Sequence, residues 1–368
     1  MATIGKQTAM IGGPNSGNAR NGTGCFVRLK NGAILYAYDE YLGDGWDDHH
    51  PNRICCYYSY DEGESWQDKR VVLKQPKNAK NISVISLARM DNGDLGMLYS
   101  FRRMDTDAEE ITGTITHHFV RSLDDGLTWS EPVDCMPVRK DNYYAIGNDR
   151  LVRLKNGRWI YPISRHSVFE EDAQFAPGVV CFFCSDDDGF TWKKLPAEIS
   201  GSLPGDVDGW QEPGLYEMDD GTLWCYARSG LGWQFKSCSY DGGKNWSPMM
   251  PDYRYSSPPS PMIVKSVGEW TVSVFNPVPR RVDEKQSRLM GRTPLVCAVS
   301  EDGGRTHSRL YYLEDDPHNA YCYPTVFDGE GYFLVSYDHS NQTDDCHTSA
   351  KILKIPYEEI QKDKGRII

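Results

Sequence analysis

The chain has 368 residues and a net charge of −12 at pH 7, without a basic stripe or a run of lysines. Nucleic acids and anionic membrane surfaces are therefore poor candidates as partners, and no apolar run approaches the roughly 18 residues that a membrane-spanning helix needs. The 22 Tyr, ten Trp and 34 Gly favour many short strands joined by turns. The composition does not indicate an oligomeric state.

The start of the chain and its cysteines bear on location. The first residues, MATIGKQTAM, lack the apolar region and cleavage pattern of a signal peptide, so we expect a cytoplasmic protein, or a secreted one if a signal was removed. Most of the eleven cysteines lie in apolar, strand-like runs, which favours free thiols and a reducing compartment. Cys181 and Cys184 have C-x-x-C spacing, but on a strand they face opposite sides, so we predict no metal site there.

Six segments share one pattern, an apolar stretch, a Gly-containing turn and a second apolar stretch. Asn-Gly and Asp-Gly pairs between β-rich runs are typical of hairpins, because these turns need positive φ. In chain order the predicted hairpins are VRLKNGAILYAY (27–38), ARMDNGDLGMLY (88–99), VRLKNGRWIYPI (152–163), YEMDDGTLWCYA (216–227), VKSVGEWTVSVF (264–275) and VFDGEGYFLVSY (326–337).

A second repeat, S-x-D-x-G-x-x-W, follows five of these hairpins after another strand-like run. We expect its Asp to accept backbone N–H bonds, its Gly to supply positive φ and its Trp to pack between blades, so the repeat reports on fold rather than chemistry. The copies are SYDEGESW (59–66), SLDDGLTW (122–129), SDDDGFTW (185–192), SYDGGKNW (239–246) and SEDGGRTH (300–307), in which His307 replaces the Trp.

A hairpin, a third strand, the box as a turn and a fourth strand make one unit. Six units of about sixty residues predict an all-β protein, a six-bladed β-propeller of four-stranded antiparallel blades forming a single domain over residues 1–368. The sixth unit lacks a box and ends in AKILKIPY (350–357). We therefore expect the N-terminal segment near residues 3–11 to pair with it and close the ring.

Chain reversal at every turn sorts the links onto two faces. Hairpins and boxes are separated by two strands and share one face, so the remaining links emerge on the other, and loops held by a rigid scaffold are where binding residues concentrate. In chain order these links carry Arg20, Asp48, Asn148, Asp149, Arg150, His166, Glu212, Arg228, Arg292, Tyr321 and Tyr323. We expect these side chains to converge on one axial pocket.

The boxes and this set of side chains resemble those of the sialidases (neuraminidases), six-bladed propellers with boxes of the S-x-D-x-G-x-x-W form. The resemblance in fold covers nearly the whole chain. It implies an exo-glycosidase that removes a terminal acidic sugar, sialic acid by default, with retention of configuration. It also implies three arginines for the substrate carboxylate, a Tyr nucleophile paired with a Glu, and an Asp acid/base.

The resemblance also assigns roles residue by residue. Glu212, ahead of GLYEMDDGTLWCYAR, is similar to the sialidase Glu, and Arg228 and Arg292 are similar to two of the arginines. Asp48, six positions before ICCYYS, is similar to the acid/base. The nucleophile assigned in AYCYPTV is Tyr321, with Tyr323 as the alternative.

Some candidates depart from the sialidase pattern. The Arg-Ile-Pro motif is absent and Arg20 lies about two residues early, so its place in the triad stays open. Asp149, Arg150 and His166 have no counterpart in that pattern, and we expect them to bind substrate in a divergent branch of the superfamily.

The expected chemistry explains why these residue types occur together. A planar guanidinium forms paired, charge-assisted hydrogen bonds with a carboxylate, such as the one on the anomeric carbon of a sialic acid. A carboxylate nucleophile would meet that negative charge, whereas a Tyr activated by a Glu avoids it. No cofactor or metal is implied. The alternatives are a propeller glycosidase or lyase for another uronic or deoxy-sugar, and a non-catalytic carbohydrate-binding propeller.

Overall fold

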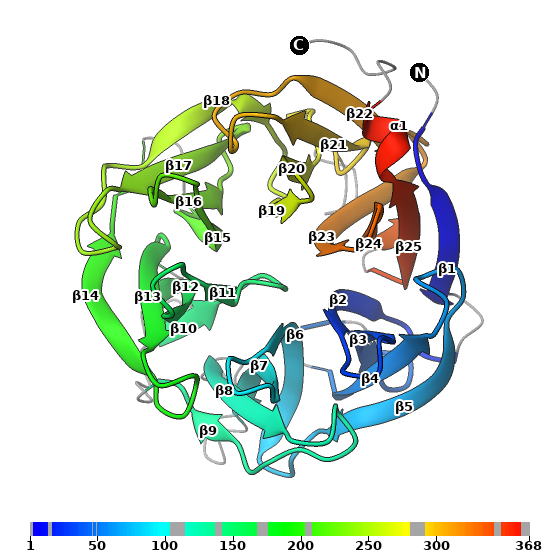
Figure 1. Ribbon diagram of the computed structural model, residues 1–368. Coiled ribbons are helices and arrows are strands. Elements are labelled where there is room, and N and C mark those ends of the chain that lie inside the picture. The colour runs from blue at the N-terminus through cyan, green and yellow to red at the C-terminus, as the bar shows by residue number, and fades with distance from the viewer. Residues whose placement is uncertain are drawn as a thin grey trace.

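The structure is a computed structural model that describes residues 3–13, 17–45, 47–48, 50–103, 115–136, 142–167, 176–201, 203, 208–279, 291–341 and 347–361. Six antiparallel sheets are arranged as blades in a ring around a central axis (Figure 1), as predicted. Within these residues α1 (Tyr357–Gln361) is the one α-helix, and it is far too short to cross a membrane.

Four blades are meanders of four consecutive strands, with the first strand innermost (Figure 1). Blade 1 consists of β2 (Asn21–Arg28), β3 (Ile34–Tyr41), β4 (Asn52–Ser59) and β5 (Gln67–Lys74). Blade 2 consists of β6 (Ala79–Arg89), β7 (Leu95–Arg103), β8 (Ile115–Ser122) and β9 (Val133–Asp134). Blade 4 consists of β15 (Gln211–Glu217), β16 (Leu223–Arg228), β17 (Trp233–Ser239) and β18 (Met250–Ser256). Blade 5 consists of β19 (Ile263–Val267), β20 (Trp270–Phe275), β21 (Leu295–Ser300) and β22 (Arg309–Glu314).

Blade 6 is built from both ends of the chain. Its strands are β23 (Asn319–Asp328), β24 (Tyr332–Asn341), β25 (Ser349–Pro356) and β1 (Lys6–Gly12). The N-terminal strand β1 runs antiparallel to β25, with Lys6 opposite Lys354 and Gly12 opposite Ser349. These backbone hydrogen bonds close the ring.

Blade 3 differs because its inner strand is divided. β10 (Asn142–Ala145) and β11 (Val152–Arg153) both pair with β12 (Trp159–Ser167), which is followed by β13 (Val179–Ser185) and β14 (Lys193–Ile199). Residues 146–151, here called the axial segment, leave the sheet between β10 and β11, and the chain at this point reaches towards the centre of the ring (Figure 1).

The boxes have the structural role predicted for them. In the first box Asp61 Oδ1 accepts hydrogen bonds from Ser59 Oγ (2.8 Å) and from the backbone N–H of Ser65 (2.9 Å). The fourth box residue has positive φ in every copy, as at Glu62. The Trp side chains pack between blades, as Trp66 does between blades 1 and 6, while His307 hydrogen-bonds Tyr255 (2.8 Å) instead.

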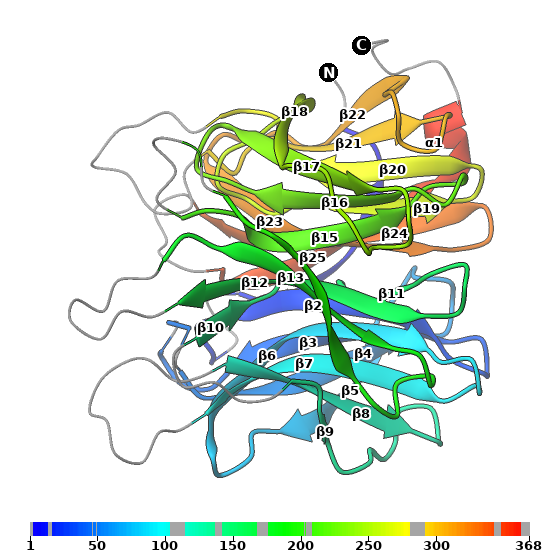
Figure 2. The same cartoon turned by 90° about the vertical axis from the view of Figure 1, so that its left-hand side faces the viewer.

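The two faces are sorted as chain reversal predicts, with the hairpin turns of β15–β16, β19–β20 and β23–β24 on the same side of the disc (Figure 2). The cysteines also behave as expected, since all ten described ones are free thiols. Cys181 packs into the core cluster between blades 2 and 3, and Cys184 into the cluster between blades 3 and 4.

Candidate active site

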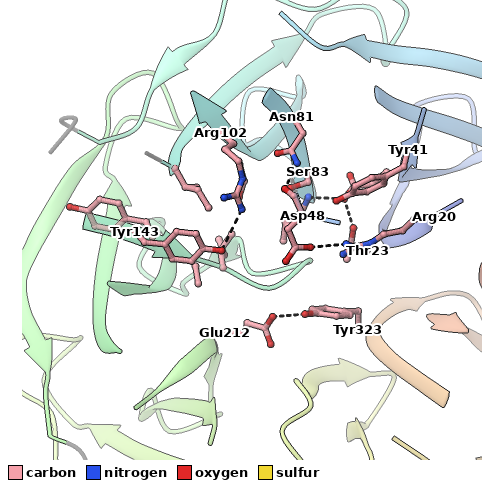
Figure 3. A pocket seen from close by; sticks show the side chains of 17 residues that line it. Arg20, Thr23, Tyr41, Asp48, Asn81, Ser83, Arg102, Tyr143, Glu212 and Tyr323 are labelled. Carbon is pink, nitrogen blue, oxygen red and sulfur yellow. Dashed lines mark hydrogen bonds and ion pairs between the residues drawn. The ribbon is translucent and has the colours of Figure 1, made fainter. Parts of the chain in front are cut away.

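A cavity lies near the axis of the ring, and Figure 3 shows the side chains that line it. The labelled side chains that line it come from the starts of first strands and the ends of second strands, or from the links beside them. They include Arg20, Tyr41, Asp48, Asn81, Arg102, Tyr143, Glu212 and Tyr323. The face on which the site was predicted is therefore the face on which the structure has this cavity.

A tyrosine, a glutamate and an arginine form a hydrogen-bonded chain at the cavity. The Tyr323 hydroxyl donates to Glu212 Oε1 at 2.6 Å, and Arg228 Nη1 donates to Glu212 Oε2 at 2.6 Å. Burial raises the pKa of Glu212, but Arg228, the Tyr323 hydrogen bond and Arg292 outweigh it, so this pKa lies below its usual value. Burial and the charge of Glu212 raise the pKa of Tyr323 well above its usual value. Near neutral pH the proton therefore resides on Tyr323 and Glu212 is ionised.

The second carboxylate of the cavity is Asp48. Its side chain is largely exposed and lies across the cavity from the Glu212–Tyr323 pair (Figure 3). Arg20 Nη1 donates to Asp48 Oδ1 at 2.6 Å and the Arg20 guanidinium stacks 4.7 Å from the ring centre of Tyr41. Asn81 Nδ2 donates to the backbone oxygen of Asp48. The Asp48 loop is thus tied to blades 1 and 2.

Three predicted arginines converge on Tyr323. Arg292 lies over its ring with 5.8 Å from the guanidinium carbon to the ring centre, and Arg228 contacts its partner Glu212. The positive charges of Arg228 and Arg292 lower the pKa of the Tyr323 hydroxyl, although burial and Glu212 outweigh them. The Tyr323 hydroxyl in turn contributes to the raised pKa of Arg20. Of the three, only Arg20 lines the cavity, while Arg228 and Arg292 act on Tyr323 from behind it through their charge.

Arg292 is held by a buried cluster behind Tyr323. Its Nη1 donates to Cys322 Sγ (3.2 Å) and lies 3.3 Å from His347 Nε2. Burial, Arg292 and Arg20 lower the pKa of His347 well below its usual value, so the neutral ring can accept this hydrogen bond. Cys322, His347 and Asp338 offer three atoms within 4.8 Å of one another that could bind a metal. Because a guanidinium already points at two of these three groups, the cluster is better suited to hold Arg292 than a cation.

Four pocket residues have backbone conformations that side chains rarely adopt. Thr23 (φ 47°), Val84 (φ 58°), Glu212 (φ 44°) and Tyr323 (φ 50°) each lie where the inner strand of a blade shifts register against its neighbour. Such bulges reorient side chains, and positive φ in a non-glycine residue costs about 1–3 kcal/mol. The inner strands of blades 1, 2, 4 and 6 are therefore all distorted at the cavity.

Two buried acids satisfy the N–H groups of two bulges. Asp338 Oδ1 accepts from Thr23 N (2.7 Å), while Asp39 Oδ2 accepts from Val84 N (3.0 Å) and from the Thr23 hydroxyl. Burial raises the pKa of Asp39 to about 7, against the Thr23 and Val84 hydrogen bonds and Arg20, and raises that of Asp338 to about 8. In their protonated form these two acids add no negative charge beside Arg20 and Arg292.

The first choice of catalytic tyrosine, Tyr321, does not lie at the cavity. Its side chain is fully buried in the core between blades 5 and 6, where its ring packs 5.8 Å from that of Tyr337. In a regular strand Tyr321 and Tyr323 would share a face. The bulge between Cys322 and Thr325 separates them, and only Tyr323 lines the cavity. The alternative, Tyr323, therefore takes the place expected of Tyr321.

Three further predicted residues do not line the cavity. Asp149 and Arg150 belong to the axial segment, where Asp149 Oδ1 pairs with Lys265 (2.8 Å) and Arg150 Nη2 donates to the Met262 oxygen (2.9 Å). His166 is buried beside the ring of Tyr143, and its Nδ1 lies 2.9 Å from the Ala176 oxygen. The expectation that these three contact substrate is not supported by their positions.

Sequence reasoning missed Asn81, Arg102 and Tyr143. Asn81 lies near the start of β6 and Arg102 near the end of β7, positions that correspond in blade 2 to those of Glu212 and Arg228 in blade 4. Arg102 Nη2 lies 3.5 Å from the Tyr143 hydroxyl. Applying one rule to every blade, the start of the first strand and the end of the second, would have identified Asn81 and Arg102.

The chain resembles known proteins both in sequence and in fold. Residues 27–335 match the family model described as a BNR repeat-like domain. Mouse sialidase-4 is 29% identical over 140 residues, 35% of this chain, and the match spans only 28% of that relative's length.

Two solved structures share the fold. A protein of unknown function from Dyadobacter fermentans has a TM-score of 0.71 at 16% identity, covering 95% of this chain and 99% of the other. The leech intramolecular trans-sialidase in complex with 2,7-anhydro-Neu5Ac has a TM-score of 0.73 at 14% identity, covering 98% and 71%. At these identities the likeness concerns the fold alone. Because the family model matches most of the six blades, the chain belongs to the family of BNR repeat-like domains.

Proposed function

We propose that the protein is a retaining exo-glycosidase that removes a terminal acidic sugar, with sialic acid as the default substrate. The observation that carries this proposal is the Tyr323–Glu212–Arg228 chain facing Asp48 across one cavity. Arg20 and Arg292 approach the same tyrosine, which gives an anionic sugar a local positive site on a protein of net charge −12. The sialidase-4 match and the sialidase-like fold point the same way.

In the first step of this mechanism the Tyr323 oxygen attacks the anomeric carbon. Its proton passes to Glu212, to which it is already hydrogen-bonded, while the bond from the anomeric carbon to the leaving oxygen breaks. Asp48, in its protonated form, donates a proton to that leaving oxygen. Because Tyr323 is neutral before attack, it meets no repulsion from the substrate carboxylate.

In the second step water attacks the anomeric carbon of the glycosyl-tyrosine. Asp48 accepts a proton from the water, and Tyr323 leaves as its oxygen regains the proton held by Glu212. The sugar is released with its configuration retained after two displacements.

The direct test is release of 4-methylumbelliferone from its sialic acid glycoside, beside the corresponding glucuronide and neutral glucoside. The proposal expects turnover of the sialoside, with product of retained configuration by proton NMR. Turnover of the glucuronide alone would favour the uronic-sugar alternative. Binding of free N-acetylneuraminic acid by calorimetry with no turnover of any of the three glycosides would favour a non-catalytic binding protein.

We expect Arg20→Lys to raise KM for the sialoside about tenfold with a smaller change in kcat. A lysine keeps the charge but loses the paired donors that match a carboxylate, and one such loss is worth about 1–2 kcal/mol. Steady-state kinetics of the two proteins checks this. An unchanged KM would remove Arg20 from carboxylate binding.

We expect KM for the sialoside to rise between about pH 6 and pH 9. The raised pKa values of Asp39 (about 7) and Asp338 (about 8) mean that both acids lose protons in this range, which adds negative charge beside Arg20 and Arg292. Asp39→Asn imitates the protonated form and should weaken the rise. The pH dependence of KM in both proteins checks this, and identical profiles would contradict it.

A further inference from the structure

The motif Asn148-Asp149-Arg150 lies in the axial segment and has no part in the proposed chemistry. All three residues are buried, and none of them lines the cavity. The segment touches the five other blades, at Gly24 (blade 1), Ile85 and Ser86 (blade 2), Tyr226 (blade 4), Lys265 (blade 5), and Tyr323 and Thr325 (blade 6). A loop from one blade thus connects the inner parts of all six.

The contacts of the axial segment fall on the bulges. Asn148 Nδ2 donates to the backbone oxygens of Gly24 (2.8 Å) and Tyr323 (3.1 Å), and Asp149 N donates to the oxygen of Ile85 (3.0 Å). Each of these carbonyls belongs to a residue inside a register shift. A bulge takes backbone groups out of the sheet ladder, and a buried carbonyl without a donor is costly. The axial segment supplies those donors.

Asp149 adds a second restraint on the Tyr323 bulge. Its Oδ2 accepts from the Thr325 hydroxyl at 2.8 Å, and Thr325 is the residue at which β23 returns to register. Its Oδ1 pairs with Lys265 of blade 5 at 2.8 Å. Burial lowers the pKa of Lys265, but Asp149 outweighs it, so Lys265 stays charged and the ion pair stays intact near neutral pH. The bulge is therefore held on both sides, at Tyr323 by Asn148 and at Thr325 by Asp149.

These restraints matter because the bulge sets the direction of one side chain. Without it Tyr323 would follow Tyr321 towards the core between blades 5 and 6. A strained conformation of this kind persists only where its surroundings determine it. The bond from Tyr323 to Glu212 alone fixes the hydroxyl but not the backbone.

We propose that Asn148 and Asp149 are positioning residues, which hold the Tyr323 bulge from the axis of the ring and so keep the Tyr323 hydroxyl on Glu212. The expected effect on catalysis rests on the proposed function, whereas the expected effect on the position of Tyr323 does not. It gives the Asn-Asp-Arg motif a role in the site without any contact to substrate.

The test is Thr325→Val, which removes the hydroxyl that donates to Asp149 and keeps the shape of the side chain. The matched control is Thr271→Val in blade 5, because Thr271 is also buried and its hydroxyl bonds the Tyr216 hydroxyl (2.9 Å) far from Tyr323. We expect Thr325→Val to lower kcat about 10- to 100-fold, the range typical of a misplaced reacting group, with KM changed less than about threefold. Both variants should lose similar thermal stability, and the control should keep kcat within about twofold.

A crystal structure of each variant provides a readout that does not depend on activity. The 2.6 Å contact between Tyr323 and Glu212 should be lost in Thr325→Val and kept in Thr271→Val. If the Asn148→Ala variant folds, its structure should also lack the contact between Tyr323 and Glu212. If that variant does not fold, the test rests on Thr325→Val. Unchanged kcat together with an intact contact in Thr325→Val would overturn the inference. A wild type that turns over no glycoside would refute the proposed function, while the contact would still test the positioning role.

Discussion

Tyr323→Phe should lower kcat for an aryl sialoside by at least about 100-fold, whereas Tyr321→Phe should leave it within about twofold. The Tyr323 hydroxyl is the atom that would attack the anomeric carbon, and it is bonded to the group that would take its proton. The two changes remove the same atom from tyrosines only two positions apart, so each is the control for the other. Steady-state kinetics and thermal unfolding of both variants provide the measurement.

Stability separates this result from a folding defect. The Tyr321 hydroxyl makes no hydrogen bond of normal geometry among the described residues, although Asn319 and Glu314 lie near enough to act on its pKa, so removing it should change the free energy of unfolding by at most about 1 kcal/mol. Loss of the Tyr323 hydroxyl leaves Glu212 paired with Arg228, and the fold should tolerate it. Equal activity of the two variants would contradict the assignment, and loss of activity in Tyr321→Phe alone would restore the sequence-based choice.

The repeats made the architecture predictable from sequence. Each box has a local set of hydrogen bonds, such as those around Asp61, and each hairpin has its own turn residues, so six short patterns report six blades. Chain reversal then brought Glu212, Arg228 and Asp48 to one face, although they are far apart in sequence. These inferences needed only the period of the pattern and the direction of the chain.

The parts that could not be predicted depend on departures from regular strands. The alternation of side chains along β23 places Tyr321 and Tyr323 on one face, and the bulge that separates them has no clear signal in AYCYPTV. Likewise, VRLKNGRWIYPI predicts a plain hairpin, whereas the inner strand of blade 3 is divided and residues 146–151 turn into the axis. Both departures are stabilised by partners from other blades, which a local pattern cannot reveal.

Glu212→Gln should lower kcat about 10²- to 10⁴-fold, because an amide cannot accept the proton that Tyr323 loses on attack. The variant keeps the shape of the side chain, and its amide oxygen can still accept the hydrogen bond from Arg228, so binding of free N-acetylneuraminic acid by calorimetry should be retained. Glu217→Gln is the matched control, since Glu217 ends the same strand β15 on the hairpin face, where it accepts a hydrogen bond from Lys155 N (2.6 Å). It should keep kcat within about twofold.

The pH profile gives Glu212 a signature that a general loss of structure would not. The pKa of Glu212 lies below the ordinary glutamate pKa of about 4.3, so its carboxylate stays ionised as the pH falls to that value. The enzyme should lose activity through protonation of Glu212 only at still lower pH. In wild type kcat/KM should therefore persist to below the ordinary glutamate pKa before falling, and the part of the fall due to Glu212 should vanish in Glu212→Gln. An unchanged kcat in the variant would show that Tyr323 does not give its proton to this carboxylate. The phenol and the glutamate would then be a structural pair, and the case for a tyrosine nucleophile would end with it.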